Sequence, residues 1–142
     1  MVQMVERGLE PRARQGDSEK ITVNLGYVDL GQVDLLVRDG FYANRTDFIR
    51  TAIRNQLQRH GEVVDRSVAR QGLEMGLRHY TRAELQAAVD AGTKLRIQVL
   101  GLASIAADVD PQLARAAIAS LSVLGGLSAT PEIKAALADR IH

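Results

Sequence analysis

The sequence predicts an α+β protein in two parts: a strand followed by two helices, and then a small α/β layer with about three parallel strands. Three observations support this prediction. Residues 20–25 alternate between polar and apolar side chains, residues 30–57 carry apolar residues at helical spacing, and apolar stretches recur 24 residues apart in the second half. A period of two residues is typical of a half-buried strand, and a period of 3.6 of an amphipathic helix.

The composition limits the classes of function that are open to this chain of 142 residues. It contains no cysteine, which excludes disulfides, thiolate metal sites and cysteine nucleophiles. The longest apolar run, residues 99–107, is far too short to span a bilayer, and the N-terminus lacks the apolar core of a signal peptide. We therefore expect a soluble cytoplasmic protein with no membrane partner.

Residues 1–18 are expected to form a flexible arm, because they are polar, mixed in charge and without any period. Arg7, Arg12 and Arg14 in this arm suit contacts with a nucleic-acid backbone or minor groove. An unbound tail is the alternative.

Residues 20–25 are predicted to form a strand with two different faces. Its apolar face consists of Ile21, Val23 and Leu25. Its polar face consists of Lys20, Thr22 and Asn24. A strand this short has no partner in its own segment, and two short helices cannot enclose a core. We therefore expect it to pair antiparallel with the same strand of a second chain, which makes the protein an obligate homodimer.

Two helices are predicted to follow this strand. The first carries an apolar side formed by Leu30, Val33, Leu36 and Val37. Gly40 ends it as a left-handed cap, and Asn44 starts the second helix by capping its free amides, with Asp47 in the positive first turn. The second helix has an apolar stripe of Phe48, Ile49, Ala52, Ile53 and Leu57. The expected dimer core draws on the strand and on both helices: Ile21, Val23, Leu25, Val33, Leu36, Phe48, Ile49 and Ile53.

Residues 19–61 resemble the ribbon-helix-helix superfamily of bacterial and phage DNA-binding proteins, of the MetJ, Arc and CopG type. The resemblance rests on the alternating strand, on Gly40 and on the run Asn-Arg-Thr-Asp-Phe-Ile-Arg at residues 44–50, followed by Ala52, Ile53 and Leu57. It covers about a quarter of the chain. It implies a dimeric, sequence-specific DNA-binding transcriptional regulator, and we expect a repressor.

The polar face of such a ribbon suits base readout, because a two-stranded ribbon fits the major groove of double-stranded DNA. Lys20, Thr22 and Asn24 are the expected readers. The start of the second helix, with free amides and a positive dipole end, suits a phosphate. The expected phosphate contacts are Asn44, Arg45, Thr46 and Arg50. The alternatives are a solvent-exposed strand face and a plain helix cap.

Residues 62–142 match no motif, but their apolar residues recur. Offsets of 24 residues relate Leu73, Ile97 and Leu121, and also Met75, Val99 and Val123, in stretches predicted as strands. The same offset relates Leu85, Val109 and Ile133, and also Val89, Leu113 and Leu137, in or near helical segments. Thr81 with Glu84 predicts a capping box, Gly92 a helix stop, and Asp110-Pro111 and Thr130-Pro131 two further helix starts.

Successive strand-helix units favour parallel strands with the helices packed on them. The alternative is an unrelated α/β arrangement with an accidental period. The two edge strands make this layer a candidate for joining dimers into higher oligomers, and ligand sensing is the other role that we consider for it. A second function class is an antitoxin or a plasmid-partition protein that uses residues 62–142 to bind a protein partner.

Catalysis finds little support in the sequence. His60, His79 and His142 are the only histidines, and none is spaced for metal binding or lies beside a plausible nucleophile. Phosphate loops of the GxxxxGK type and HExxH motifs are absent. We expect a protein that is not an enzyme and that needs no cofactor or metal.

Overall fold

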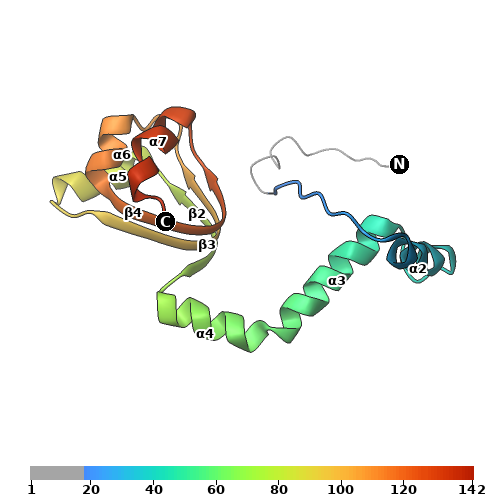
Figure 1. Cartoon of the computed structure of the whole chain (residues 1–142). Coiled ribbons are helices and arrows are strands. Elements are labelled where there is room, and N and C mark those ends of the chain that lie inside the picture. The colour runs from blue at the N-terminus through green and yellow to red at the C-terminus, as the bar shows by residue number, and fades with distance from the viewer. Residues whose placement is uncertain (1–17) are drawn as a thin grey trace. The chain divides into compact units, whose positions relative to one another are not determined.

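The computed structural model describes residues 18–142, which form two compact units, Lys20–Arg70 and Gln71–His142 (Figure 1). The first unit holds α2 (Tyr27–Arg38), α3 (Arg45–Arg59) and α4 (Gly61–Gln71). The second holds β2 (Glu74–Tyr80), α5 (Arg82–Asp90), β3 (Leu95–Ile105), α6 (Pro111–Ala117), β4 (Ile118–Ser128), α7 (Pro131–Ala136) and a 3₁₀ turn (Ala138–Arg140). The expected arm, with Arg7, Arg12 and Arg14, lies outside the described residues except for Ser18.

Helix α2 begins at Tyr27, earlier than the Leu30 from which the apolar period predicted it. Its end follows the prediction, because Gly40 has a φ of 88°. The Gly40 amide donates to the carbonyl of Val37, and the Phe41 amide donates to that of Leu36. This pair of hydrogen bonds is a Schellman motif, which requires a left-handed residue after the helix. The predicted cap at Gly40 is confirmed.

Helix α3 begins as predicted at Asn44, whose Oδ1 accepts a hydrogen bond of 2.8 Å from the Asp47 amide. The Asp47 carboxylate in turn accepts from the Ala43 amide at 2.9 Å. After α3, the Val64 amide donates to the His60 carbonyl, and α4 starts at Gly61. Residues 62–70 thus belong to the first unit, whereas the expected boundary followed Gly61.

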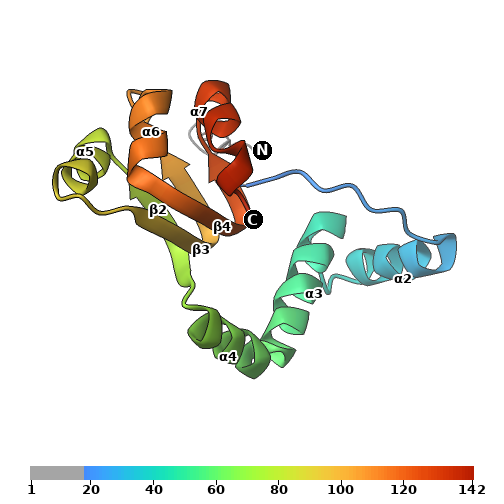
Figure 2. The same ribbon diagram turned by 60° about the vertical axis from the view of Figure 1, so that its left-hand side comes forward.

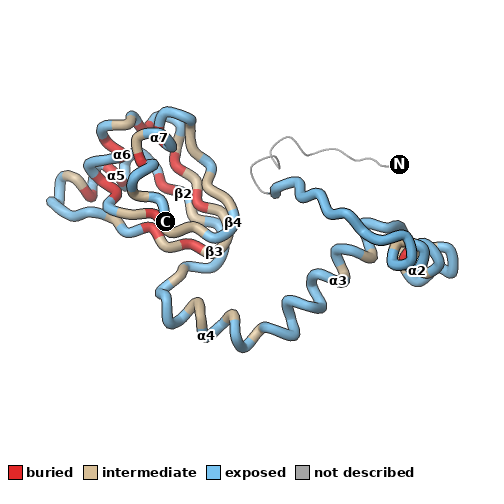
Figure 3. Tube along the Cα trace, viewed as in Figure 1, coloured by how far each residue is buried: buried red, intermediate tan, exposed pale blue. Residues whose placement is uncertain are grey.

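The apolar side chains of the first unit are mostly exposed in the single chain (Figure 3). Among its described residues only Val33 is buried, on the predicted apolar side of α2. Ile21 is 76% exposed and Val23 is 70% exposed. The predicted stripe of α3, namely Phe48, Ile49, Ala52, Ile53 and Leu57, is half-buried at best within one chain.

The second unit contains a sheet of three parallel strands, as predicted, and the order of the strands is β2-β3-β4. Figure 2 shows α5, α6 and α7 on one side of this sheet. The core lies between the helices and the sheet, and its fully buried side chains include Leu85, Ile97, Val99, Ile118, Leu121, Ile133 and Leu137. The capping box of Thr81 and Glu84 and the caps at Asp110 and Thr130 are all present, so these helix starts are confirmed.

The register of the strands confirms the 24-residue period only in part. Ile97 lies opposite Leu121 and Val99 opposite Val123, as predicted. Between β2 and β3, however, Glu74 lies opposite Val99, and Met75 lies opposite Leu100. The predicted matches of Leu73 with Ile97 and of Met75 with Val99 are therefore wrong. A shift of one residue reverses the face, so Met75 is exposed although Val99 is buried.

A row of glycines crosses the sheet. Gly76, Gly101 and Gly125 are in register and have φ angles of 125°, 140° and 121°. A Cβ on Gly101 would overlap the carbonyl oxygen of Gly76, and one on Gly125 would overlap that of Gly101. Glycine is therefore required where these strands approach one another.

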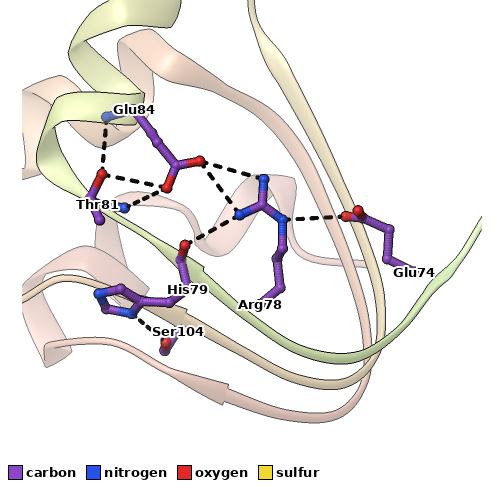
Figure 4. Close-up of polar contacts among 6 residues, drawn as sticks. All are labelled: Glu74, Arg78, His79, Thr81, Glu84 and Ser104. Carbon is purple, nitrogen blue, oxygen red and sulfur yellow. Dashed lines mark hydrogen bonds and ion pairs between the residues drawn. The ribbon is translucent and has the colours of Figure 1, made fainter.

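The side chain of Arg78 links the edge strand β2 to α5 (Figure 4). Its guanidinium lies 3.4 Å from the Glu84 carboxylate, 3.7 Å from that of Glu74 and 4.5 Å from the centre of the Tyr80 ring. The hydrogen bond from the Thr81 amide holds the pKa of Glu84 below its usual value, and Arg78 lowers it further. Glu84 therefore stays ionised and joins the helix cap to the strand.

Candidate nucleic-acid interface

The first part of the candidate interface is the segment that carries Lys20, Thr22 and Asn24. All three residues are exposed, and residues 18–26 form no strand in the single chain. The predicted strand would form its hydrogen bonds with the same segment of a second chain. The conformation of a single chain therefore does not decide whether the strand forms. The ribbon stays a prediction.

The second part is the start of α3. The first hydrogen bond inside this helix runs from the Phe48 amide to the Asn44 carbonyl, at 3.2 Å. The amides of Arg45 and Thr46 precede it and are not used by the helix, so they form the positive end of the helix dipole. Because the Asn44 side chain binds the Asp47 amide, these two amides are the backbone donors that a phosphate could reach.

Arg45 takes part in a bidentate ion pair that the sequence analysis missed. Its Nε and Nη2 each lie 2.8 Å from a carboxylate oxygen of Asp34 on α2. The hydrogen bond from Arg45 lowers the pKa of Asp34, and Asp34 raises the pKa of Arg45. Both side chains are about half exposed, at 56% for Arg45 and 49% for Asp34. The pair links α2 to the start of α3.

The other predicted phosphate residues lie on one side of α3. Thr46 and Arg50 are four residues apart, and Arg54 continues the same row. The structure brings Asn44, Arg45, Thr46 and Arg50 together on the first turns of the helix. Lys20, Thr22 and Asn24 lie on a separate extended segment, and no hydrogen bond joins them to these α3 residues in the single chain.

Between residues 18 and 142, no group of three or more histidine, aspartate or glutamate side chains is arranged to hold a metal ion. None of the helices described is both long enough and apolar enough to cross a membrane.

Comparison with known proteins gives one finding. The model of the ribbon-helix-helix transcriptional regulator family matches residues 16–134. This match covers the segment with Lys20, Thr22 and Asn24 and continues through the sheet to α7, so it includes the part of the chain that no motif identified. No curated protein and no solved structure matches the chain significantly.

Proposed function

Because the chain belongs to the ribbon-helix-helix transcriptional regulator family, we propose that it is a repressor that binds double-stranded DNA as a homodimer. In this proposal, residues 20–25 of two chains pair as an antiparallel ribbon that enters the major groove. The observation that supports it best is that residues 20–25 alternate between polar and apolar side chains and are all exposed in the single chain.

The apolar face supports dimerisation. Ile21 and Val23 are largely exposed in one chain, and Ile49 and Ile53 on α3 are about half exposed. Fully burying a side chain of this kind contributes roughly 1.5–3 kcal/mol. Pairing two strands and packing four helices over them would cover these residues together with the rest of the proposed core: Leu25, Val33, Leu36 and Phe48.

The polar face supports base readout. Each ribbon would present Lys20, Thr22 and Asn24 twice, related by the two-fold axis. Asn24 has the donor and acceptor that pair with adenine N7 and N6, Lys20 can reach guanine O6 or N7, and Thr22 can contact a polar edge or the thymine methyl group.

The start of α3 supplies the proposed phosphate contacts. The amides of Arg45 and Thr46, the Asn44 cap and the Arg50 side chain would hold one phosphate on each side of the ribbon. Arg45 uses Nε and Nη2 for Asp34. Its Nη1 remains the donor that it would offer to DNA.

Residues 62–142 have the proposed role of joining ribbon dimers into tetramers, so that neighbouring half-sites are bound cooperatively through effective concentration. The sheet supports this role, since a parallel sheet has edges and faces that other chains can cover. Cytoplasmic location follows from the proposed function as a regulator.

The experiment for the proposed function is selection of bound sites from random double-stranded DNA with the full-length protein, followed by footprinting. We expect one enriched motif with two-fold symmetry, protected in the major groove, and two chains bound per motif. Recovery of unenriched sequences, at the same affinity as the starting pool, would rule out sequence-specific binding.

A further inference from the structure

One face of the sheet has no helix on it. In β3, Ile97, Val99 and Ala103 point into the core under α5, α6 and α7, and the alternate residues point the other way. We call this second side the open face. It comprises Met75, Leu77 and His79 of β2, Arg96, Gln98, Leu100, Leu102 and Ser104 of β3, and Ser120, Ser122, Leu124, Gly126 and Ser128 of β4.

The register sorts the open face into rows. The two central rows are apolar: Met75, Leu100 and Leu124 lie side by side, and so do Leu77, Leu102 and Gly126. A polar row flanks them on each side, with Gln98 and Ser122 on one and with His79, Ser104 and Ser128 on the other. An apolar centre with a polar rim is the usual anatomy of a protein–protein interface.

The central rows are exposed to an unusual degree for a parallel sheet. Met75 is 58% exposed, Leu77 76% and Leu124 55%. Purely parallel sheets occur almost only with both faces covered. A contiguous exposed patch of large apolar side chains marks an interaction site.

We propose that the open face packs against the open face of a second copy of this chain. The proposal rests on the proposed function, in which residues 62–142 join dimers, and it names the surface that does so. The two central rows of the open face include no charged residue, and the one arginine of this face, Arg96, lies at the start of β3, beyond the row of Gln98 and Ser122. The central rows of two identical faces can therefore stack about a two-fold axis without like charges meeting between them.

The shape and the rim of the face also suit a second copy. Gly126 has no side chain, and Leu102 Cδ1 lies 3.4 Å from the position of a Cβ on it, so this part of the face is low in relief. At the rim, His79 Nδ1 and Ser104 Oγ share a hydrogen bond of 2.7 Å, so these polar groups remain paired when water leaves (Figure 4).

The strand edges are a less suitable surface than the open face. Ile141 forms a parallel bridge with Leu121 of β4, and the His142 amide donates to the Leu121 carbonyl at 2.8 Å. The C-terminal residues of the chain thus cover part of the β4 edge. On the β2 edge, the ion pairs of Arg78 place charge beside the strand.

The test compares the full-length protein with its Leu77→Glu and Leu124→Glu variants by light scattering and by binding to DNA with one or two sites. Both leucines are exposed, so we expect the fold to tolerate glutamate at either position. We expect tetramers for the unaltered protein and dimers for both variants, with loss of cooperativity on two-site DNA and unchanged affinity for one site. Gln112→Glu on α6 adds the same charge on the helix side and should change neither.

A cross-linking experiment locates the contact. The chain has no cysteine, and stacked sheets lie about 10 Å apart, so a short bismaleimide should join Leu102→Cys to its counterpart. Ala135→Cys, exposed on α7, is the control. Equal cross-linking of the two variants, or tetramers that persist in both glutamate variants, would overturn the open-face contact. Efficient cross-linking of Leu102→Cys in a protein that selects no DNA site would support this contact and contradict the proposed function instead.

Discussion

At the scale of single residues, Arg45 has one observed partner, Asp34, and one proposed partner, a DNA phosphate. Its ion pair with Asp34 fixes the start of α3 against α2. The proposed function also places Arg45 on a phosphate, which must share the guanidinium with the Asp34 carboxylate. An arginine held in this way is oriented in advance, so it loses little side-chain freedom on binding.

The salt dependence of DNA binding distinguishes the ion pair of Arg45 from its proposed phosphate contact. Arg45→Ala should weaken binding to all sequences and reduce the slope of log affinity against log salt by roughly 0.9, the value for one phosphate. Asp34→Asn removes a negative charge and keeps the cation, so affinity should rise while the slope is retained. Arg82→Ala on α5 serves as the control for loss of a positive charge.

If Arg45→Ala leaves this slope unchanged, and if both variants lower the unfolding temperature equally, Arg45 acts only in the ion pair. In that case the phosphate contact belongs to the amides of Arg45 and Thr46 and to Arg50.

At the scale of elements, the glycine row limits how the three strands can approach. Gly76 and Gly101 have similar positive φ angles, but they differ in their surroundings. A Cβ on Gly76, at the sheet edge, meets no atom within 4 Å, whereas one on Gly101 overlaps the Gly76 carbonyl. The pair therefore separates backbone strain from steric overlap.

We predict that Gly76→Ala lowers the free energy of unfolding by roughly 1–3 kcal/mol, the usual cost of a non-glycine residue in this region of backbone space. Gly101→Ala should lower it considerably more, because the added methyl group pushes β2 away from β3. Urea unfolding followed by circular dichroism measures both variants. Equal losses would show that the strands move apart without cost.

Elements with local signals could be predicted from the sequence. Thr81, Asp110 and Thr130 are caps whose partners lie three residues away, so a short stretch of sequence contains the whole interaction. Gly40 was predicted for the same reason. The register of β3 with β4 was also correct, because the residues that were matched, Ile97 with Leu121 and Val99 with Val123, lie on the covered face of both strands.

The features that were predicted wrongly or missed also have physical causes. In β2 the apolar residue Met75 belongs to the open face, so matching it with the buried Val99 of β3 gave the wrong register. The ion pair of Asp34 with Arg45 joins residues eleven positions apart across a turn, where the sequence gives no periodic signal. The row of glycines appears only once the strands are aligned.

At the scale of the whole molecule, both compact units leave apolar surface exposed. In Lys20–Arg70 it includes the strand segment and α3, and in Gln71–His142 it is the open face. Two distinct apolar surfaces allow two kinds of contact between copies: one that makes the ribbon and another that joins ribbons. The family match extends over both units, which agrees with their acting in one regulator.

The central claim is that the paired segments read DNA bases, and Asn24→Ala tests it most directly. Fluorescence anisotropy would give the affinity of the protein and of this variant for the selected site and for random DNA of the same length, at one salt concentration. We predict a loss of about 1–3 kcal/mol at the selected site and none on random DNA, because only base contacts are removed. Equal losses on both DNAs, or no loss on either, would contradict base readout by this strand.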